Sequence, residues 1–85
     1  MNWEIRWNPK AFKFLDKLPK DTALRVIDKL EQVKANPFHY LEHFEGDRML
    51  YKLRIGDYRI LVDVDFQQHV LKIRVFDHRG RVYER

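Results

Sequence analysis

The dipeptide Gly56-Asp57 lies between two runs that are rich in Leu, Ile, Val and Tyr, and it constrains the fold more than any other feature. A pair of this kind is typical of a tight β-hairpin, because glycine readily adopts the positive φ that such turns need. We therefore predict a hairpin over residues 48–63. A two-residue turn makes Ile55 and Tyr58 opposite neighbours, and counting back then places Arg54 directly opposite Arg59.

This register gives the hairpin one apolar and one basic face, because strand side chains alternate in direction. The basic face carries Arg48, Lys52, Arg54 and Arg59. Like charges directly opposite each other destabilise a sheet. Two readings of the Arg54 and Arg59 pair remain open: the side chains spread into water, or they form a cationic platform that binds an anion.

The positive charge of the chain is concentrated in its second half. Residues 1–47 carry 8 Lys and Arg against 8 Asp and Glu, whereas residues 48–85 carry 9 against 5, which accounts for the whole net charge of +4. A basic half indicates a polyanionic partner, either nucleic acid or an acidic protein. Ordinary surface solubility is the alternative explanation.

The remaining elements are predicted from hydrophobic periodicity and from the positions of proline. They are a strand over Asn2–Trp7, a helix from Asn8-Pro9 to Leu18, a helix from Lys20 to Ala35, a connecting loop over Phe38–Asp47, a turn near Phe66-Gln67-Gln68, and a last strand. The long helix has an apolar stripe of Ala23, Val26, Ile27, Leu30 and Val33. In the last strand we expect Leu71, Ile73 and Val75 on one face, with Val70, Lys72, Arg74 and Phe76 on the other.

These elements predict one α+β domain over residues 1–85. Its order is β-α-α-β-β-β, with the helical hairpin packed on one face of a mainly antiparallel four-stranded sheet. The other face of the sheet stays open and basic. The N-terminal residues lack the apolar run of a signal peptide, and no stretch approaches the ~18 apolar residues of a membrane span, so we expect a cytoplasmic protein.

Several kinds of chemistry have little support in the composition. The chain has no cysteine and no serine, and its single threonine, Thr22, lies at a helix start where capping explains it. His39 and His43 are four residues apart, but a zinc site needs about four suitable ligands, so we expect no metal and no cofactor. Asp63 and Asp65 are better explained as ion-pair partners of Lys72 and Arg74 than as catalytic acids.

Cationic chemistry on a phosphate remains. Cleavage of RNA needs no protein nucleophile, because the ribose 2′-OH can attack the adjacent phosphorus. The protein must hold that geometry, stabilise the charge on the phosphoryl oxygens and move two protons. Arg59 and Arg79 can supply the electrostatic part, and Tyr83 can stack on a base.

The chain resembles the RelE/ParE superfamily of toxin–antitoxin toxins, and within it the RelE-type messenger RNA interferases. The resemblance covers the whole length. It rests on the Trp-rich first strand, on Leu18-Pro19, on the run YKLRIGDYR from Tyr51 to Arg59, on His78-Arg79 and on Val82-Tyr83.

The resemblance implies a ribosome-dependent endoribonuclease that cuts mRNA in the A site, inhibits translation, needs no metal and leaves a 2′,3′-cyclic phosphate. It also implies roles for individual residues. The implied catalytic residues are Lys52, Arg54, Arg59, Arg79 and Tyr83. Lys72 and Arg74 on the open basic face, and Arg81 just beyond its end, are expected as further RNA ligands from their position. Relatives have a lysine where this chain has Arg54, and arginine is effectively never deprotonated, so Lys52 or His78 must handle the proton.

Each role has a structural alternative. Lys52 is then an exposed strand lysine, Arg59 an ion-pair partner of Asp57 or Asp63, Tyr83 a packing residue at the sheet margin and Arg79 a solvated turn residue. Two other functions also stay open: a ParE-like toxin that binds DNA gyrase without nuclease activity, and a non-catalytic RNA-binding module. The nuclease and the ParE-like toxin both imply a cognate antitoxin that wraps the domain with an acidic helical segment. For the nuclease this antitoxin is expected to be RelB-like.

Overall fold

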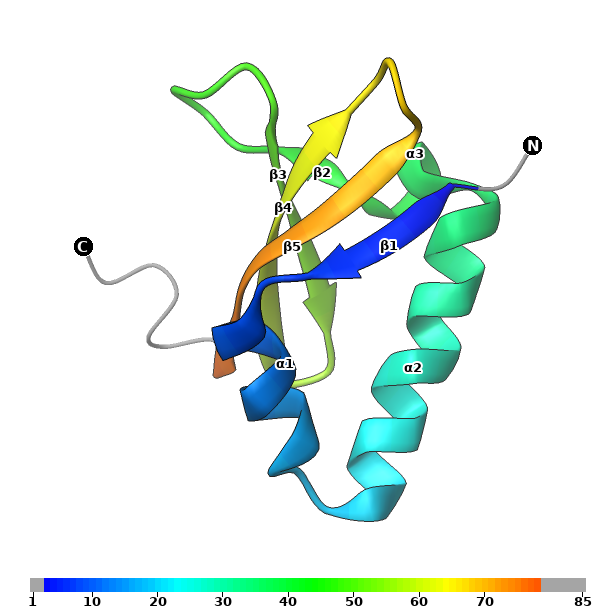
Figure 1. The fold of residues 1–85 in the computed structure, drawn as a ribbon, viewed down its shortest axis with the longest axis vertical. Helices are drawn as coiled ribbons and strands as arrows, with labels where there is room; N and C mark the ends of the chain where they lie inside the picture. Colours follow the sequence, from blue (N-terminus) through cyan, green and yellow to red (C-terminus); the bar gives the residue numbers. More distant parts are fainter. Residues whose placement is uncertain (1–2, 79–85) are drawn as a thin grey trace.

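The computed structural model describes residues 3–78, which form a sheet with a pair of helices against one face (Figure 1). The elements are β1 (Glu4–Trp7), α1 (Pro9–Asp16), α2 (Lys20–Ala35), α3 (Pro37–Tyr40), β2 (Glu42–His43), β3 (Leu50–Ile55), β4 (Tyr58–Asp65) and β5 (Val70–His78). The core lies between the helical pair and the sheet. It is lined by Ala11 and Leu15 of α1, by Val26, Leu30 and Val33 of α2, and by strand residues such as Ile60, which is 0% exposed.

The five strands follow the order β1-β5-β4-β3-β2. Strand β1 runs parallel to β5, and every other pair is antiparallel. The predicted α+β class and the predicted order of the main elements are confirmed. The structure adds to the prediction in one region: residues 38–47, expected as a loop, contain most of α3 and the short strand β2, which brings the sheet to five strands.

The helical hairpin forms where the prolines predict it. The side-chain Oδ1 of Asn8 accepts a hydrogen bond from the backbone N–H of Lys10 at 2.8 Å, and Pro9 occupies the first turn of α1. The predicted bounds of α2 are confirmed, but its predicted stripe is wrong at Ile27, which is 42% exposed. The sheet meets only the side of α2 that carries Val26, Leu30 and Val33, so Ile27 faces outward. No helix within residues 3–78 has the length and apolar character that a membrane crossing requires.

The central hairpin has the predicted register. Ile55 pairs with Tyr58, and Arg54 pairs with Arg59. Gly56 has a φ of 57°, in the left-handed region that favours glycine, which explains why this residue opens the turn. The turn chemistry therefore sets which side chains of β3 and β4 share a face.

Strand β5 departs from the predicted alternation because it carries one extra residue. Leu61 pairs with Val75 but Val62 pairs with Ile73, so Arg74 is the additional residue of a β-bulge. Beyond the bulge the faces exchange. Phe76 packs in the main core, whereas Val75 joins Leu50, Leu61 and Phe44 in a small apolar cluster on the other face. The sequence predicts a wholly polar open face, and the small apolar cluster shows that this prediction is wrong in part.

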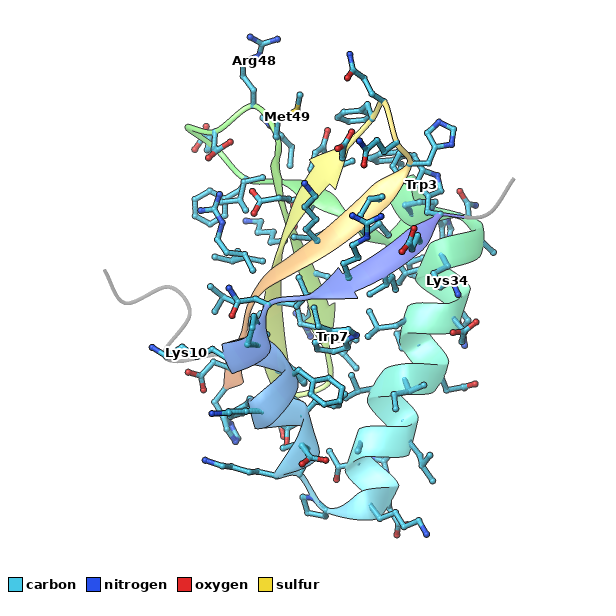
Figure 2. All side chains as sticks on the ribbon, viewed as in Figure 1. Trp3, Trp7, Lys10, Lys34, Arg48 and Met49 are labelled. Atoms are coloured by element: carbon cyan, nitrogen blue, oxygen red, sulfur yellow. The ribbon has the colours of Figure 1, made fainter. Side chains whose placement is uncertain are left out.

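Aromatic contacts tie together segments that are distant in the sequence. Trp3, which precedes β1, meets Phe38 of α3 with ring centroids 5.7 Å apart, and Phe38 stacks on Phe66 of the β4–β5 turn, also at 5.7 Å. Figure 2 shows Trp3 at this end of the sheet and Trp7 between the sheet and the helices. These contacts fix α3, and hence Tyr40 at its end, against the sheet.

Candidate functional site

A pocket of about 440 Å³ lies where the central hairpin meets the helical layer. It is lined by Lys29 of α2, Tyr40 of α3, Glu42 of β2, Lys52, Leu53 and Arg54 of β3, and Arg59 of β4. In the described part of the chain β2 pairs only with Tyr51 and Lys52, so the outer edge of β3 beyond Lys52 has no strand beside it. The pocket wraps around this edge and joins the open face of the sheet to the helices.

Arg59 is the most enclosed cation of the pocket. It is 9% exposed, and its Nη1 donates hydrogen bonds to the backbone carbonyls of Tyr58 at 3.2 Å and Gly56 at 3.4 Å. Neither Asp57 nor Asp63, the expected alternatives, pairs with it. The turn carbonyls therefore hold one end of the guanidinium without neutralising its charge. An anion can still contact the rest of the Arg59 guanidinium. Such a charge-assisted contact is stronger than a neutral hydrogen bond, and partial burial of the site strengthens it further.

The rest of the sheet side of the pocket is also basic. Arg54 is exposed opposite Arg59, and neither arginine forms an ion pair within residues 3–78. Lys52 lies opposite Glu42 in the β2–β3 ladder. The lining thus contains four cationic side chains and one carboxylate, and it favours an anion.

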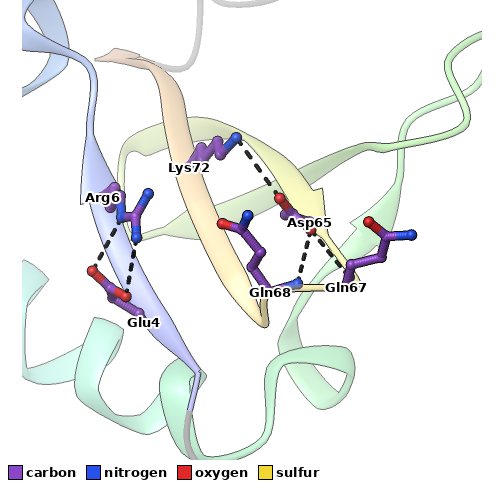
Figure 3. A network of polar contacts seen from close by, with 6 residues as sticks. All are labelled: Glu4, Arg6, Asp65, Gln67, Gln68 and Lys72. Atoms are coloured by element: carbon purple, nitrogen blue, oxygen red, sulfur yellow. Dashed lines mark hydrogen bonds and ion pairs between the residues drawn. The ribbon is translucent and has the colours of Figure 1, made fainter.

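At the other end of the open face the cations are paired. Arg74 makes a bidentate ion pair with Asp63, at 2.7 and 2.9 Å, and these hydrogen bonds raise the pKa of Arg74 above its usual value. The Nζ of Lys72 lies 3.9 Å from Oδ2 of Asp65 (Figure 3). The Oδ1 of Asp65 accepts hydrogen bonds from the backbone N–H groups of Gln67 and Gln68. The structural role expected for the two aspartates is confirmed.

His78 does not join the pocket. It pairs with Tyr58 in the β4–β5 ladder, and its ring lies 5.0 Å from that of Tyr58 and 6.4 Å from that of Phe14 of α1. This is the helix-covered side of the sheet, whereas Arg59 and its ladder partner Asp77 point to the open side. The expectation that His78 exchanges protons beside Arg59 therefore has no support in the geometry. Arg79, Arg81 and Tyr83 lie outside the described residues.

Three pocket residues were not predicted from the sequence: Lys29, Tyr40 and Glu42. Lys29 looked like part of a solvated helix face, and the other two lie in the segment expected as a loop. The signal that could have found Glu42 is its cross-strand position opposite Lys52, but a two-residue strand has no hydrophobic period of its own. Residues 3–78 bring no three His, Asp or Glu side chains together in a way that would hold a metal ion.

The fold is that of solved toxin structures from toxin–antitoxin complexes. A chain of the RelBE2 complex of Mycobacterium tuberculosis superposes with a TM-score of 0.82 at 22% identity, covering 93% of this chain and 100% of that one. A chain of the archaeal RelE–RelB complex from Pyrococcus horikoshii gives 0.77 at 28% identity, covering 95% and 99%. The isolated E. coli RelE toxin gives 0.76 at 21% identity, covering 95% and 90%. The fold is thus that of small RelE toxin domains.

The sequence comparison gives the family. Residues 5–83 match the family described as the ParE toxin of the type II toxin–antitoxin system, parDE. This match spans nearly the whole chain, so the protein belongs to this family of toxins, within the RelE/ParE superfamily that the sequence resembles. A search of curated proteins found no match.

Proposed function

We propose that this toxin is a ribosome-dependent endoribonuclease that cuts mRNA in the A site and so inhibits translation in the cytoplasm. The observation that carries the proposal is the contrast along the open face. Arg74 and Lys72 are paired with carboxylates, whereas Arg54 and Arg59 gather in a pocket without such partners among residues 3–78. Two opposed arginines destabilise a sheet, but they stabilise the negative charge that develops on a phosphate in the transition state.

The reaction proposed is attack of the ribose 2′-oxygen on the adjacent phosphorus. The 2′-O–P bond forms, the P–O5′ bond breaks, and the products are a 2′,3′-cyclic phosphate and a free 5′-hydroxyl. Arg59, held by the turn carbonyls, stabilises the charge that builds on the phosphoryl oxygens, and Arg54 adds to it. Arginine stays protonated, so we assign Lys52 to take up the proton that the 2′-OH loses, while the 5′-oxygen gains a proton from water as it leaves. Arg79 and Tyr83 keep their proposed roles as phosphate ligand and base-stacking residue, and Lys72, Arg74 and Arg81 as outer RNA contacts.

The proposed partners are the ribosome with its mRNA and a cognate antitoxin. The matched structures from M. tuberculosis and P. horikoshii are toxin–antitoxin complexes, which supports an antitoxin for this chain as well. We propose a RelB-like protein whose acidic helical segment wraps the domain, because the basic pocket attracts carboxylates as readily as phosphates. The reaction proposed has no step that needs a metal or another cofactor.

A second candidate function follows from the family that the sequence matches. The family is described by its ParE toxin, and the resemblance to ParE implies binding of DNA gyrase without RNA cleavage. The pocket favours the nuclease, since gyrase inhibition needs no set of residues that stabilises a reacting phosphate.

Translation assays with primer extension on the mRNA test the two functions. Purified toxin added to programmed ribosomes should give new 3′ ends at A-site codons. DNA breaks in the presence of gyrase, without mRNA ends, would replace the nuclease by the gyrase inhibitor. If neither new mRNA ends nor DNA breaks appear, the non-catalytic RNA-binding module is the remaining function.

A further inference from the structure

The pocket has a second cationic rim that belongs to the helices and not to the sheet. Lys29 of α2 and Tyr40 of α3 line the pocket together with Arg54 and Arg59. The sheet residues come from adjacent strands, so their cations act on one region of a bound anion. Lys29 approaches the same space from another layer of the fold, and it therefore serves a different part of the ligand.

Contacts with Tyr40 hold Lys29 in place. The Nζ of Lys29 lies over the ring of Tyr40, 4.6 Å from the ring centroid. The hydroxyl of Tyr40 donates a hydrogen bond to Oε1 of Gln32 at 3.3 Å, and Gln32 is one turn along α2 from Lys29. The ring is thus tied to the same helix that carries the lysine. A long side chain held in this way loses less conformational entropy when it binds a ligand.

Lys29 also keeps its charge available. Elsewhere on α2 Lys34 is 3.5 Å from the carboxylate of Glu31, but within residues 3–78 Lys29 has no carboxylate partner. The face of an aromatic ring attracts a cation without neutralising it, so the ammonium still acts as a point charge toward an anion. Glu42, the one carboxylate in the lining, lies opposite Lys52 on the sheet.

We infer that Lys29, positioned by Tyr40, binds a second RNA phosphate at the helical rim of the pocket, apart from the phosphate that reacts at Arg59. This inference rests on the proposed function and extends it. The RNA strand would cross the outer edge of β3, with one phosphate over the sheet and another beside α2. Lys29 is then a binding residue that fixes the position of the strand, while the chemical step depends on the sheet residues.

Single-turnover cleavage on programmed ribosomes, measured over a range of toxin and salt concentrations, tests the inference. For Lys29→Ala we expect the half-saturating toxin concentration to rise roughly fivefold near 0.1 M salt, because one lost phosphate contact lowers the salt slope of binding to a single strand by ~0.7. The cleavage rate at saturation should stay at the wild-type value. Lys20→Ala is the matched control, since it removes a lysine of the same helix that does not line the pocket, and it should leave both parameters unchanged.

Substitutions of Tyr40 test the positioning role. Tyr40→Phe keeps the ring face but loses the hydrogen bond to Gln32, so it should raise the half-saturating concentration less than Tyr40→Leu, which removes the ring as well; neither variant should lower the saturated rate. Binding of short single-stranded RNA without ribosomes identifies the source of the phosphate. If Lys29→Ala binds free RNA more weakly than the wild type, the phosphate belongs to the substrate strand. If binding is weaker only on ribosomes, the phosphate belongs to ribosomal RNA.

The inference and the proposed function fail in different ways. If the wild-type toxin does not cut mRNA, the proposed function is wrong. If the wild type cuts and Lys29→Ala matches Lys20→Ala in half-saturation and salt slope, Lys29 is only a structural neighbour of Tyr40 and the inference is overturned. A fall in the saturated rate with unchanged half-saturation would also overturn it, because that result places Lys29 in the chemical step.

Discussion

Arg54 and Arg59 lie opposite each other in the β3–β4 ladder, yet their surroundings differ sharply. Arg59 is 9% exposed and its Nη1 is hydrogen-bonded to two backbone carbonyls, whereas Arg54 is exposed and forms no ion pair within residues 3–78. The hairpin therefore keeps one fixed and one adaptable cation next to each other. This arrangement concentrates positive charge at the pocket and should cost the free protein some stability.

Replacing Arg54 by threonine should stabilise the free toxin and weaken its activity. The change removes the like charge opposite Arg59 and introduces a residue that favours strands, so we expect a gain of about 0.2–1 kcal/mol in the free energy of unfolding. Urea denaturation measures this gain, and single-turnover cleavage measures the loss. A variant no more stable than the wild type would contradict the expected gain from removing the like-charge pair.

Ribosome binding should weaken steeply as salt rises. The whole net charge of +4 comes from the second half of the chain, and each phosphate that a cation neutralises releases counterions. Titrations of labelled toxin onto programmed ribosomes between low and moderate salt provide the measurement. An affinity that hardly changes over this range would indicate an apolar protein partner, such as a gyrase surface.

Cleavage should survive treatment of the purified toxin with EDTA, provided that the ribosomes stay in their own magnesium buffer. The reason is that the proposed reaction uses the ribose 2′-OH as its nucleophile and side-chain cations for the developing charge. Primer extension on the treated sample reads the result. Activity that disappears and then returns on addition of zinc or manganese would contradict a metal-free mechanism.

An antitoxin that wraps the domain should raise its melting temperature, because a ligand that binds only the folded form stabilises it. Exchange of Arg54 and Arg59 for glutamate should weaken the complex if carboxylates of the antitoxin reach the pocket. Isothermal titration of the double variant tests this contact, with Lys20→Glu as a control for general charge effects. An unchanged affinity would mean that the antitoxin acts from the helical side, by steric exclusion from the ribosome.

Local sequence signals predicted the parts of the fold that depend on a few neighbouring residues. Asn8-Pro9 fixed the start of α1, and Gly56 fixed the hairpin register, because capping and positive φ are properties of single positions. The bulge at Arg74 was not predictable in this way. An alternating apolar pattern continues through residues 70–76 in the sequence, and only the register against β4 shows that one residue is extra.

The site was predictable to the extent that it lies on the hairpin. Lys52, Arg54 and Arg59 lie together as predicted, but the burial of Arg59 depends on how the turn backbone folds under its guanidinium. Lys29 and Tyr40 reach the pocket through the packing of helices on the sheet, and no sequence pattern of their own marks them. His78 was chosen for proton transfer because histidine has a suitable unperturbed pKa and because it precedes Arg79 in the resemblance, whereas the strand alternation turns it to the covered face.

The most direct test of the central claim is the single-turnover rate of mRNA cleavage on programmed ribosomes for Arg59→Ala. By analogy with an oxyanion-hole donor, a charge-assisted contact made only in the transition state is worth about 2.7–4 kcal/mol, or roughly 10²–10³ in rate, so a fall of at least tenfold is expected. The cleavage rate of Arg59→Lys should lie between those of Arg59→Ala and the wild type, because lysine keeps the charge but lacks the planar guanidinium group. Thermal melting must show that each variant is folded. A folded Arg59→Ala that cuts at the wild-type rate would contradict the account.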